Sequence, residues 1–147
     1  MNKSFCIIII FISNSLFSQT DIDWLLLRNV YYQTEYNEDF KDLSEYFQVA
    51  HFGEAVESLD NKKVRITGYM LTLSPDEGVF VLSENPYADC FFCGYGGPES
   101  AIELRLNKVN NDFMMDELVT VTGILRLKRD DVSSGVYIID NAIVIKK

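Results

Sequence analysis

The chain has 147 residues, and its 22 acidic side chains outnumber 13 lysines and arginines to give a formal net charge of −9. An acidic chain repels phosphate groups, which argues against non-specific binding of nucleic acid and against docking on anionic lipid. The sequence contains a single histidine, so a serine–histidine–aspartate triad for acyl transfer is not indicated.

Residues 1–18 predict a signal peptide. Lys3 places a positive charge ahead of the apolar run 5–12, which is too short for a permanent membrane span. We place cleavage after Ser18, which makes Gln19 the new N-terminus; an uncleaved anchor is the alternative. Removing 18 of the 147 residues leaves 129, with 12 basic and 22 acidic side chains and a net charge of −10. We therefore expect one exported domain, periplasmic or extracellular, without a permanent membrane span.

The segment 19–60 is acidic and aromatic, and it predicts a helical or irregular layer that packs on the rest of the chain. Asp21 is a candidate cap for a first helix that contains Trp24 and Leu27. Three further elements are expected in this segment: a strand over 30–36, a helix over 37–48 and a helical turn around Val56.

Residues 61–147 show the alternation of apolar and polar side chains that is typical of β-strands. Gly68 and Gly123 lie centrally in two long strands, at positions where a strand must coil or bulge. The expected fold is mainly β (α+β overall), a small five-stranded OB-like barrel with the N-terminal layer around it. The segment 110–117 is too short for the helix of the usual OB layout, so an open sandwich is the alternative. Strands are expected over 64–71, 79–83, 102–107, 119–128 and 136–145.

Cys90 and Cys93 are the cysteines that remain once Cys6 leaves with the signal peptide. Two thiols at this spacing can bond to each other or share a metal ion if the backbone turns between them. Export makes oxidation of the pair possible. Glycine permits the positive φ angles that such turns often require; the loop contains Gly94, Gly96 and Gly97.

Three chemistries are open for this cysteine pair. Zinc or another thiophilic metal needs four ligands, or three and a water, so the pair is half of such a site. A redox pair would cycle between dithiol and disulfide, although the surroundings lack a thioredoxin-like βαβ pattern. A structural disulfide would close a short loop and stabilise the fold by about 2 kcal/mol in the chain-entropy model. Further metal ligands could come from the same loop of a second copy in a dimer. Within the chain the candidates are His51, Asp89 and Glu99.

The aromatic residues around the cysteines allow two interpretations. The one that we favour is that some of them, Tyr87 included, plug one end of the barrel and become core. The other is a contact surface for a protein partner, since apolar side chains at a loop tip are typical of recognition sites. The candidate contact residues are Phe91, Phe92, Gly94, Tyr95, Gly97, Pro98, Glu99 and Ser100.

The segments 62–70, 80–83, 90–94 and 97–100 together resemble an uncharacterised family of exported bacterial proteins. Members carry a short OB-like β-domain and a CFFCG…GPES signature, and the Trp24-x-x-Leu27 start is similar too. This chain departs from the family in having Thr72 where members often have proline. The resemblance implies the architecture and directs attention to the cysteines, and it implies no established activity.

These observations lead to three hypotheses of function. The first is a non-enzymatic exported binding or accessory module whose Cys-x-x-Cys loop binds a soft metal or is locked by a disulfide. The second is a thiol–disulfide redox protein. The third is a structural accessory protein of the cell envelope.

Overall fold

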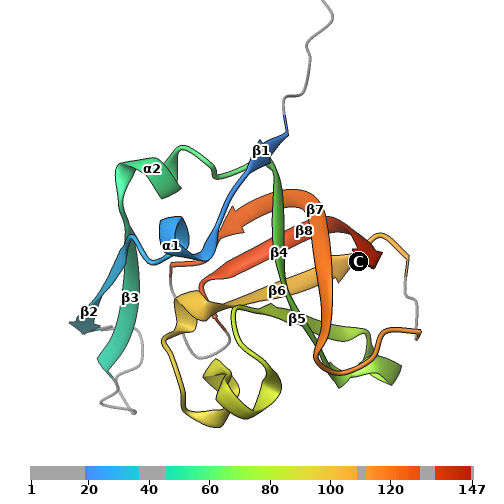
Figure 1. Cartoon of the computed structure of the whole chain (residues 1–147). Coiled ribbons are helices and arrows are strands. Elements are labelled where there is room, and N and C mark those ends of the chain that lie inside the picture. Colours follow the sequence, from blue (N-terminus) through green and yellow to red (C-terminus); the bar gives the residue numbers. More distant parts are fainter. Residues whose placement is uncertain (1–18, 37–45, 109–111, 130–134, 147) are drawn as a thin grey trace, which may run out of the picture.

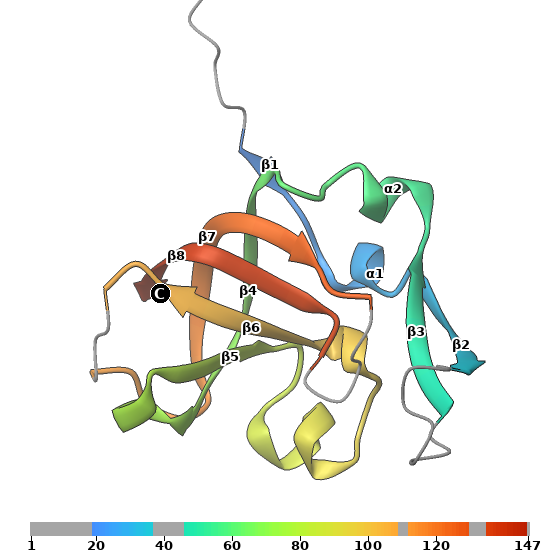
Figure 2. The ribbon, with the colours of Figure 1, turned by 180° about the vertical axis from the view of Figure 1, so that it is seen from behind.

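The computed structural model of the chain describes residues 19–36, 46–108, 112–129 and 135–146. Five strands close into a barrel in the order β4–β5–β6–β8–β7, with β7 paired back to β4 (Figures 1 and 2). β6 and β8 are parallel, and the other neighbours are antiparallel. The prediction of a mainly β, OB-like barrel is confirmed, and the open sandwich is excluded. The strands are β4 (Lys63–Ser74), β5 (Val79–Ser83), β6 (Ala101–Leu106), β7 (Glu117–Leu127) and β8 (Tyr137–Lys146).

Side chains alternate between the barrel interior and the outer face along the long strands. In β4, Val64 and Met70 are buried whereas Arg65 is exposed, as the period of a strand requires. Gly123 lies at a bulge where the register of β7 against β8 shifts. A Cβ atom there would approach the carbonyl oxygen of Asp140 to 2.7 Å. Only glycine lets the two strands come this close.

The N-terminal layer covers one end of the barrel. α1 (Trp24–Leu27) and α2 (Glu54–Glu57) lie together at that end (Figure 1). The fully buried Leu27 and Val56 belong to the same core as the barrel side chains. The Tyr137 hydroxyl donates a hydrogen bond to the Leu27 carbonyl oxygen at 2.6 Å, which ties the layer to β8. No helix in the described part of the chain is long and apolar enough to cross a membrane.

The first described residues cover an edge of β4. β5 pairs with β4 only from Tyr69 onward. Ahead of that point β1 (Thr20–Asp21) pairs with β4 in parallel, and the Trp24 indole N–H donates to the Thr67 carbonyl oxygen at 2.8 Å. Open strand edges favour aggregation, so these contacts protect the barrel at the place where β5 leaves it.

The cap of the first helix differs from the prediction. Asp23, not Asp21, accepts the hydrogen bond from the backbone N–H of Leu26, at 2.8 Å. The Asp21 carboxylate instead accepts two hydrogen bonds from the guanidinium of Arg65, at 2.6 and 2.7 Å. The pairing of β1 with β4 brings these two side chains together, and a local sequence pattern does not contain that information.

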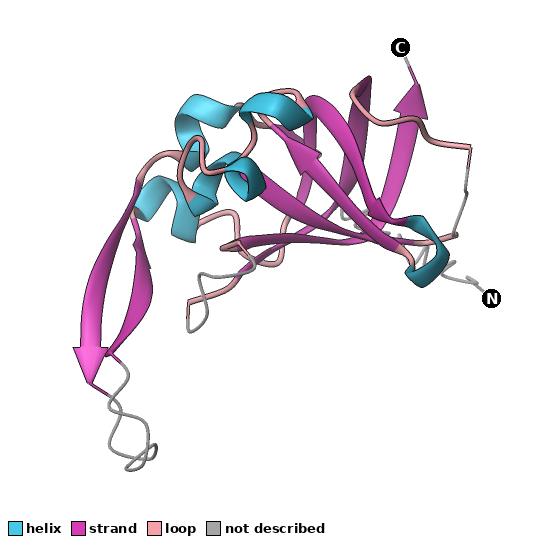
Figure 3. Cartoon of the chain, turned by 90° about the horizontal axis from the view of Figure 1, so that it is seen from below, coloured by secondary structure: helices cyan, strands magenta, loops and turns pink. Residues whose placement is uncertain are grey.

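A two-stranded hairpin extends away from the barrel (Figure 3). It consists of β2 (Val30–Tyr36) and β3 (Tyr46–Phe52), paired antiparallel. The predicted strand over 30–36 is confirmed. The predicted helix over 37–48 is wrong from Tyr46 onward, because pairing with β2 overrides the local helical spacing; residues 37–45 lie outside the described part. The helical turn expected around Val56 is α2.

Candidate functional site

The segment 84–100, which we call the Cys loop, packs against the outer face of the barrel (Figure 1). Cys90 is 1% exposed and forms a small apolar cluster with Leu71, Val81 and Ala101, apart from the barrel core. This cover explains why β5 is buried on both faces after its first residue. The loop contains three short turns of 3-10 helix: η2 (Tyr87–Asp89), η3 (Phe91–Cys93) and η4 (Pro98–Ser100).

The aromatic side chains of the Cys loop do not plug the barrel, so the interpretation that we favoured from the sequence is wrong. Phe91 packs against the outer apolar cluster. Tyr87, Phe92 and Tyr95 are exposed. Apolar side chains of the N-terminal layer belong to the barrel core instead.

The two cysteine sulfurs lie 3.7 Å apart, with Cys90 buried and Cys93 exposed. The turn η3 produces this approach, since the N–H of Cys93 donates to the Cys90 carbonyl oxygen at 3.0 Å. Gly94 follows η3, and its φ of 85° is a left-handed conformation that favours glycine. Gly97 has a φ of −96°, which any residue can adopt. Glycine is favoured there for lack of room, because a Cβ atom would collide with the Glu99 carboxylate.

The surroundings of Cys93 disfavour its thiolate form. Loss of hydration raises the pKa of the Cys93 thiol, and the neighbouring Cys90 and the charge of Asp89 raise it further. A hydrogen bond with Tyr87 acts in the opposite direction and is the smaller effect. Reactive cysteines of redox enzymes have a lowered thiol pKa. The shift at Cys93 has the opposite direction.

The other proposed metal ligands do not gather around the cysteine pair. Within the described residues, no group of three or more His, Cys, Asp or Glu side chains is arranged to hold a metal ion. His51 lies in the hairpin, where its ring stacks on Tyr31 with centroids 5.0 Å apart. Glu99 points to the other strand of the hairpin, and Asp89 is the candidate that lies beside Cys93.

Glu99 joins the Cys loop to the hairpin. The Tyr32 hydroxyl donates a hydrogen bond to the Glu99 carboxylate at 2.7 Å. Burial and this hydrogen bond raise the pKa of Tyr32 above its ordinary value. A second contact joins the start of the Cys loop to the end of α1: Arg28 forms an ion pair with Glu84, at 2.6 Å. Ser100 closes η4 with a hydrogen bond to the Gly97 carbonyl oxygen at 2.7 Å, the local bond expected of a serine here.

Nothing in the sequence marked Tyr32, Arg28 or Glu84 as contact residues of the Cys loop. Each of their contacts joins residues more than 50 positions apart, and no local motif predicts such a pair.

A groove of about 460 Å³ lies beside the Cys loop on the outer face of the barrel. Val79 and Val81 of β5 line it together with Phe92 of the Cys loop. The charged Glu103 and Arg105 line the side that β6 provides. Its one sequence signal was the outward register of alternate residues in the strand 79–83, which does not by itself distinguish a groove from an ordinary surface.

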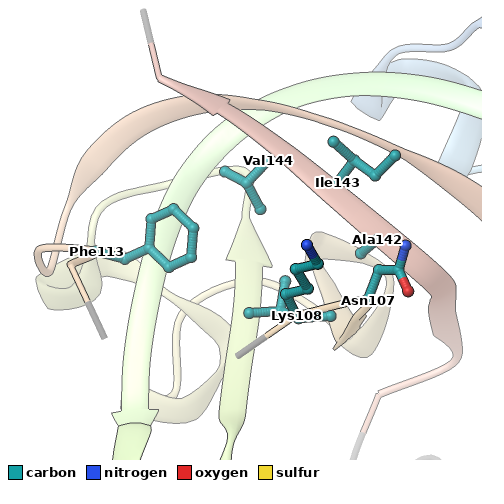
Figure 4. Close-up of a pocket in the computed structure, with 7 residues that line it drawn as sticks. Asn107, Lys108, Phe113, Ala142, Ile143 and Val144 are labelled. Carbon is teal, nitrogen blue, oxygen red and sulfur yellow. The ribbon is translucent and has the colours of Figure 1, made fainter. Parts of the chain in front are cut away.

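A second, smaller cavity of about 230 Å³ lies between the ends of β6 and β8. Figure 4 shows Phe113 and Val144 on one side of it, with Asn107 and the long Lys108 side chain on the other. Lys108 is exposed. This cavity shares no residue with the groove or the Cys loop.

Comparison with known proteins adds a likeness in fold. No family model and no curated protein matches the chain. A crystal structure of a DUF3299 family protein from Pseudomonas aeruginosa PAO1 is similar, with a TM-score of 0.53 and 13% sequence identity. The match covers 88% of this chain and 97% of that one. At this identity the likeness shows the fold alone, and it extends over the N-terminal layer as well as the barrel. The neighbour belongs to a family of unknown function.

Proposed function

We propose that the protein is an exported, non-enzymatic binding module whose Cys loop is locked against the barrel by a disulfide between Cys90 and Cys93. The proposal rests on one observation: the sulfur of the buried Cys90 lies 3.7 Å from the sulfur of the exposed Cys93. Cys90 is held in the outer apolar cluster, so a bond to it would fix the exposed half of the loop to the barrel wall.

Export is supported by the N-terminal pattern. A positive charge and a short apolar run precede a polar stretch within residues 1–18. Cleavage after Ser18 would leave the whole described fold in place, because β1 begins at Thr20. An exported protein meets oxidants that keep structural disulfides closed.

The disulfide would form by exchange with a disulfide-carrying oxidant of the exported compartment. The exposed Cys93 thiolate attacks the donor disulfide, and one donor thiolate leaves. The Cys90 thiolate then attacks the Cys93 sulfur and releases the second donor thiolate. The protein loses two electrons, the donor gains them, and the two protons of the cysteines pass to the donor thiols.

A structural bond fits this site better than a working redox pair. Strongly oxidising disulfides owe their potential to a stabilised thiolate in the reduced form. At Cys93 the surroundings disfavour the thiolate and raise the thiol pKa, so the reduced form gains no such stabilisation. The bond would hold the exposed Phe92 in place for contact with a partner.

Equilibration of the purified mature protein with glutathione buffers tests this proposal. We expect a reduction potential below about −300 mV, the range of structural disulfides. A potential near that of glutaredoxins, about −200 to −230 mV, would support the redox alternative instead. Native mass spectrometry before and after a chelator is the companion measurement, because a metal retained by both thiolates would contradict the disulfide lock.

A further inference from the structure

We propose that the groove beside the Cys loop binds a short peptide segment that carries an apolar side chain next to a basic one. This inference rests on the proposed function, and it names the class of partner that the binding module takes. The apolar side chain would lie on Val79, and the basic one would reach Glu77 at the end of the groove.

Strand register defines the groove. Val81 is paired with Leu71 on one side and with Glu103 on the other. Because alternate residues of a strand share a face, Val79 lies on the same outer face as Val81, one step closer to the β4–β5 turn. Residues on this face near the turn keep large apolar side chains at the surface: Val79 is 40% exposed, Leu73 37% and Phe92 42%.

The charges around the groove favour a cation at the end of the groove that lies next to the β4–β5 turn. Arg105 is already occupied, because its guanidinium contacts the carboxylates of Glu103 at 3.0 Å and Asp140 at 3.4 Å. Glu77 accepts a hydrogen bond from the Ser74 hydroxyl at 3.0 Å, and in the described part of the chain no lysine or arginine forms an ion pair with it. The acidic net charge of the chain adds a long-range attraction for basic segments.

The strand arrangement also decides how a peptide would bind. β5 is paired on both edges, with β4 and with β6. A peptide therefore cannot add to the sheet as a further strand, and side chains must supply the contacts. Nucleic acid, which some OB-folds bind on the same face, is disfavoured by the negative charge of Glu77 and of the chain as a whole.

The disulfide lock would shape one side of this groove. Phe92 lies between Cys90 and Cys93 in η3, so a bond between the two sulfurs restrains the backbone that carries its ring. The oxidised protein should accordingly bind the peptide more tightly than the reduced protein, since less ordering of the loop is needed on binding.

Titration of the oxidised, isotope-labelled protein followed by amide NMR tests the inference. The probe is the acetylated and amidated tetrapeptide Lys-Leu-Lys-Phe, at low salt, and the comparison peptide is Glu-Leu-Glu-Phe. We expect saturable shifts at Val79, Phe92 and Arg105 with a Kd on the order of 1 mM, typical of so small a contact. The acidic peptide should bind about tenfold more weakly.

Two variants locate the contact. Val79→Thr keeps a β-branched side chain but removes apolar surface, and it should weaken binding about fivefold. Ile143→Thr is the matched control, because Ile143 is 52% exposed on β8 and does not line the groove; it should leave binding unchanged. Absence of saturable shifts, equal binding of both peptides, or equal effects of the two variants would overturn the inference.

The outcomes separate this inference from the proposed function. An oxidised protein that does not bind the basic peptide overturns the groove assignment and leaves the disulfide lock standing. A mature protein isolated with both thiols free overturns the lock, whatever the titration shows.

Discussion

The hydrogen bond between Tyr32 and Glu99 is a direct test of how the Cys loop is held. The donor and acceptor atoms are 2.7 Å apart, and the acceptor is a carboxylate. Hydrogen bonds to charged groups contribute about 1.5–3 kcal/mol. Because Tyr32 is only partly buried, we expect the lower end, so Tyr32→Phe should lower the free energy of unfolding by about 1.5 kcal/mol. Urea unfolding of the oxidised protein measures this change.

A double-mutant cycle with Glu99→Gln gives the coupling between the two side chains. We expect a coupling of about 1 kcal/mol, because Tyr32→Phe removes the hydrogen bond and Glu99→Gln removes the charge of its acceptor. Tyr31→Phe is the matched control: Tyr31 is adjacent in β2 and 56% exposed, so its change should stay within about 0.5 kcal/mol. If the effects of Tyr32→Phe and Glu99→Gln simply add, Glu99 does not clamp the loop and this reasoning is refuted.

The same contact predicts a pH dependence. The pKa of Tyr32 is raised in the folded protein, so the protonated hydroxyl is favoured by folding. Its stabilising effect is complete below the ordinary tyrosine pKa of about 10 and is lost as the pH rises above that value. The stability difference between the wild type and Tyr32→Phe should therefore shrink above pH 10, and a difference that grows there would contradict the assignment.

Three further outcomes are expected. The alkylation rate of Cys93 in the reduced protein should rise with a midpoint above the ordinary thiol value of about 8.5, and a midpoint near pH 7 would indicate an activated thiol. Cys93→Ser should lower the stability of protein purified under oxidising conditions by about 2 kcal/mol and leave the reduced protein nearly unchanged; equal losses in both states would contradict the lock. Leu27→Ala should cost about 3 kcal/mol in urea unfolding, because Leu27 is fully buried, whereas Leu25→Ala at 74% exposure should be nearly neutral; similar effects would refute the role of the N-terminal layer.

The barrel was predictable because its signals are local. Alternating side chains mark each strand, and the glycines at 68 and 123 mark places where the chain must come close to its neighbour. The hairpin was predictable only in its first strand. Tyr46 follows apolar residues at helical spacing, yet it pairs with Tyr36 in the hairpin, and such pairing depends on the partner strand.

The closeness of the two cysteine sulfurs was predictable from the sequence, whereas the position of the loop on the barrel was not. The spacing of Cys90 and Cys93 allows the two sulfurs to meet wherever the loop lies. The side of the barrel that receives the loop depends on Leu71 and Val81, which belong to strands paired with each other. The partner of Glu99 is 67 positions away. Contacts of this range are set by the fold as a whole, so the groove and the loop clamp emerged only from the structure.

Export and the disulfide between Cys90 and Cys93 can both be checked by the intact mass of the protein recovered from the exported fraction, after denaturation in an excess of an alkylating reagent. We expect a chain that begins at Gln19 and carries no alkyl group, and that takes up two groups once a reductant is added first. A chain that retains residues 1–18, or one already alkylated on both Cys90 and Cys93 without reductant, would contradict this expectation.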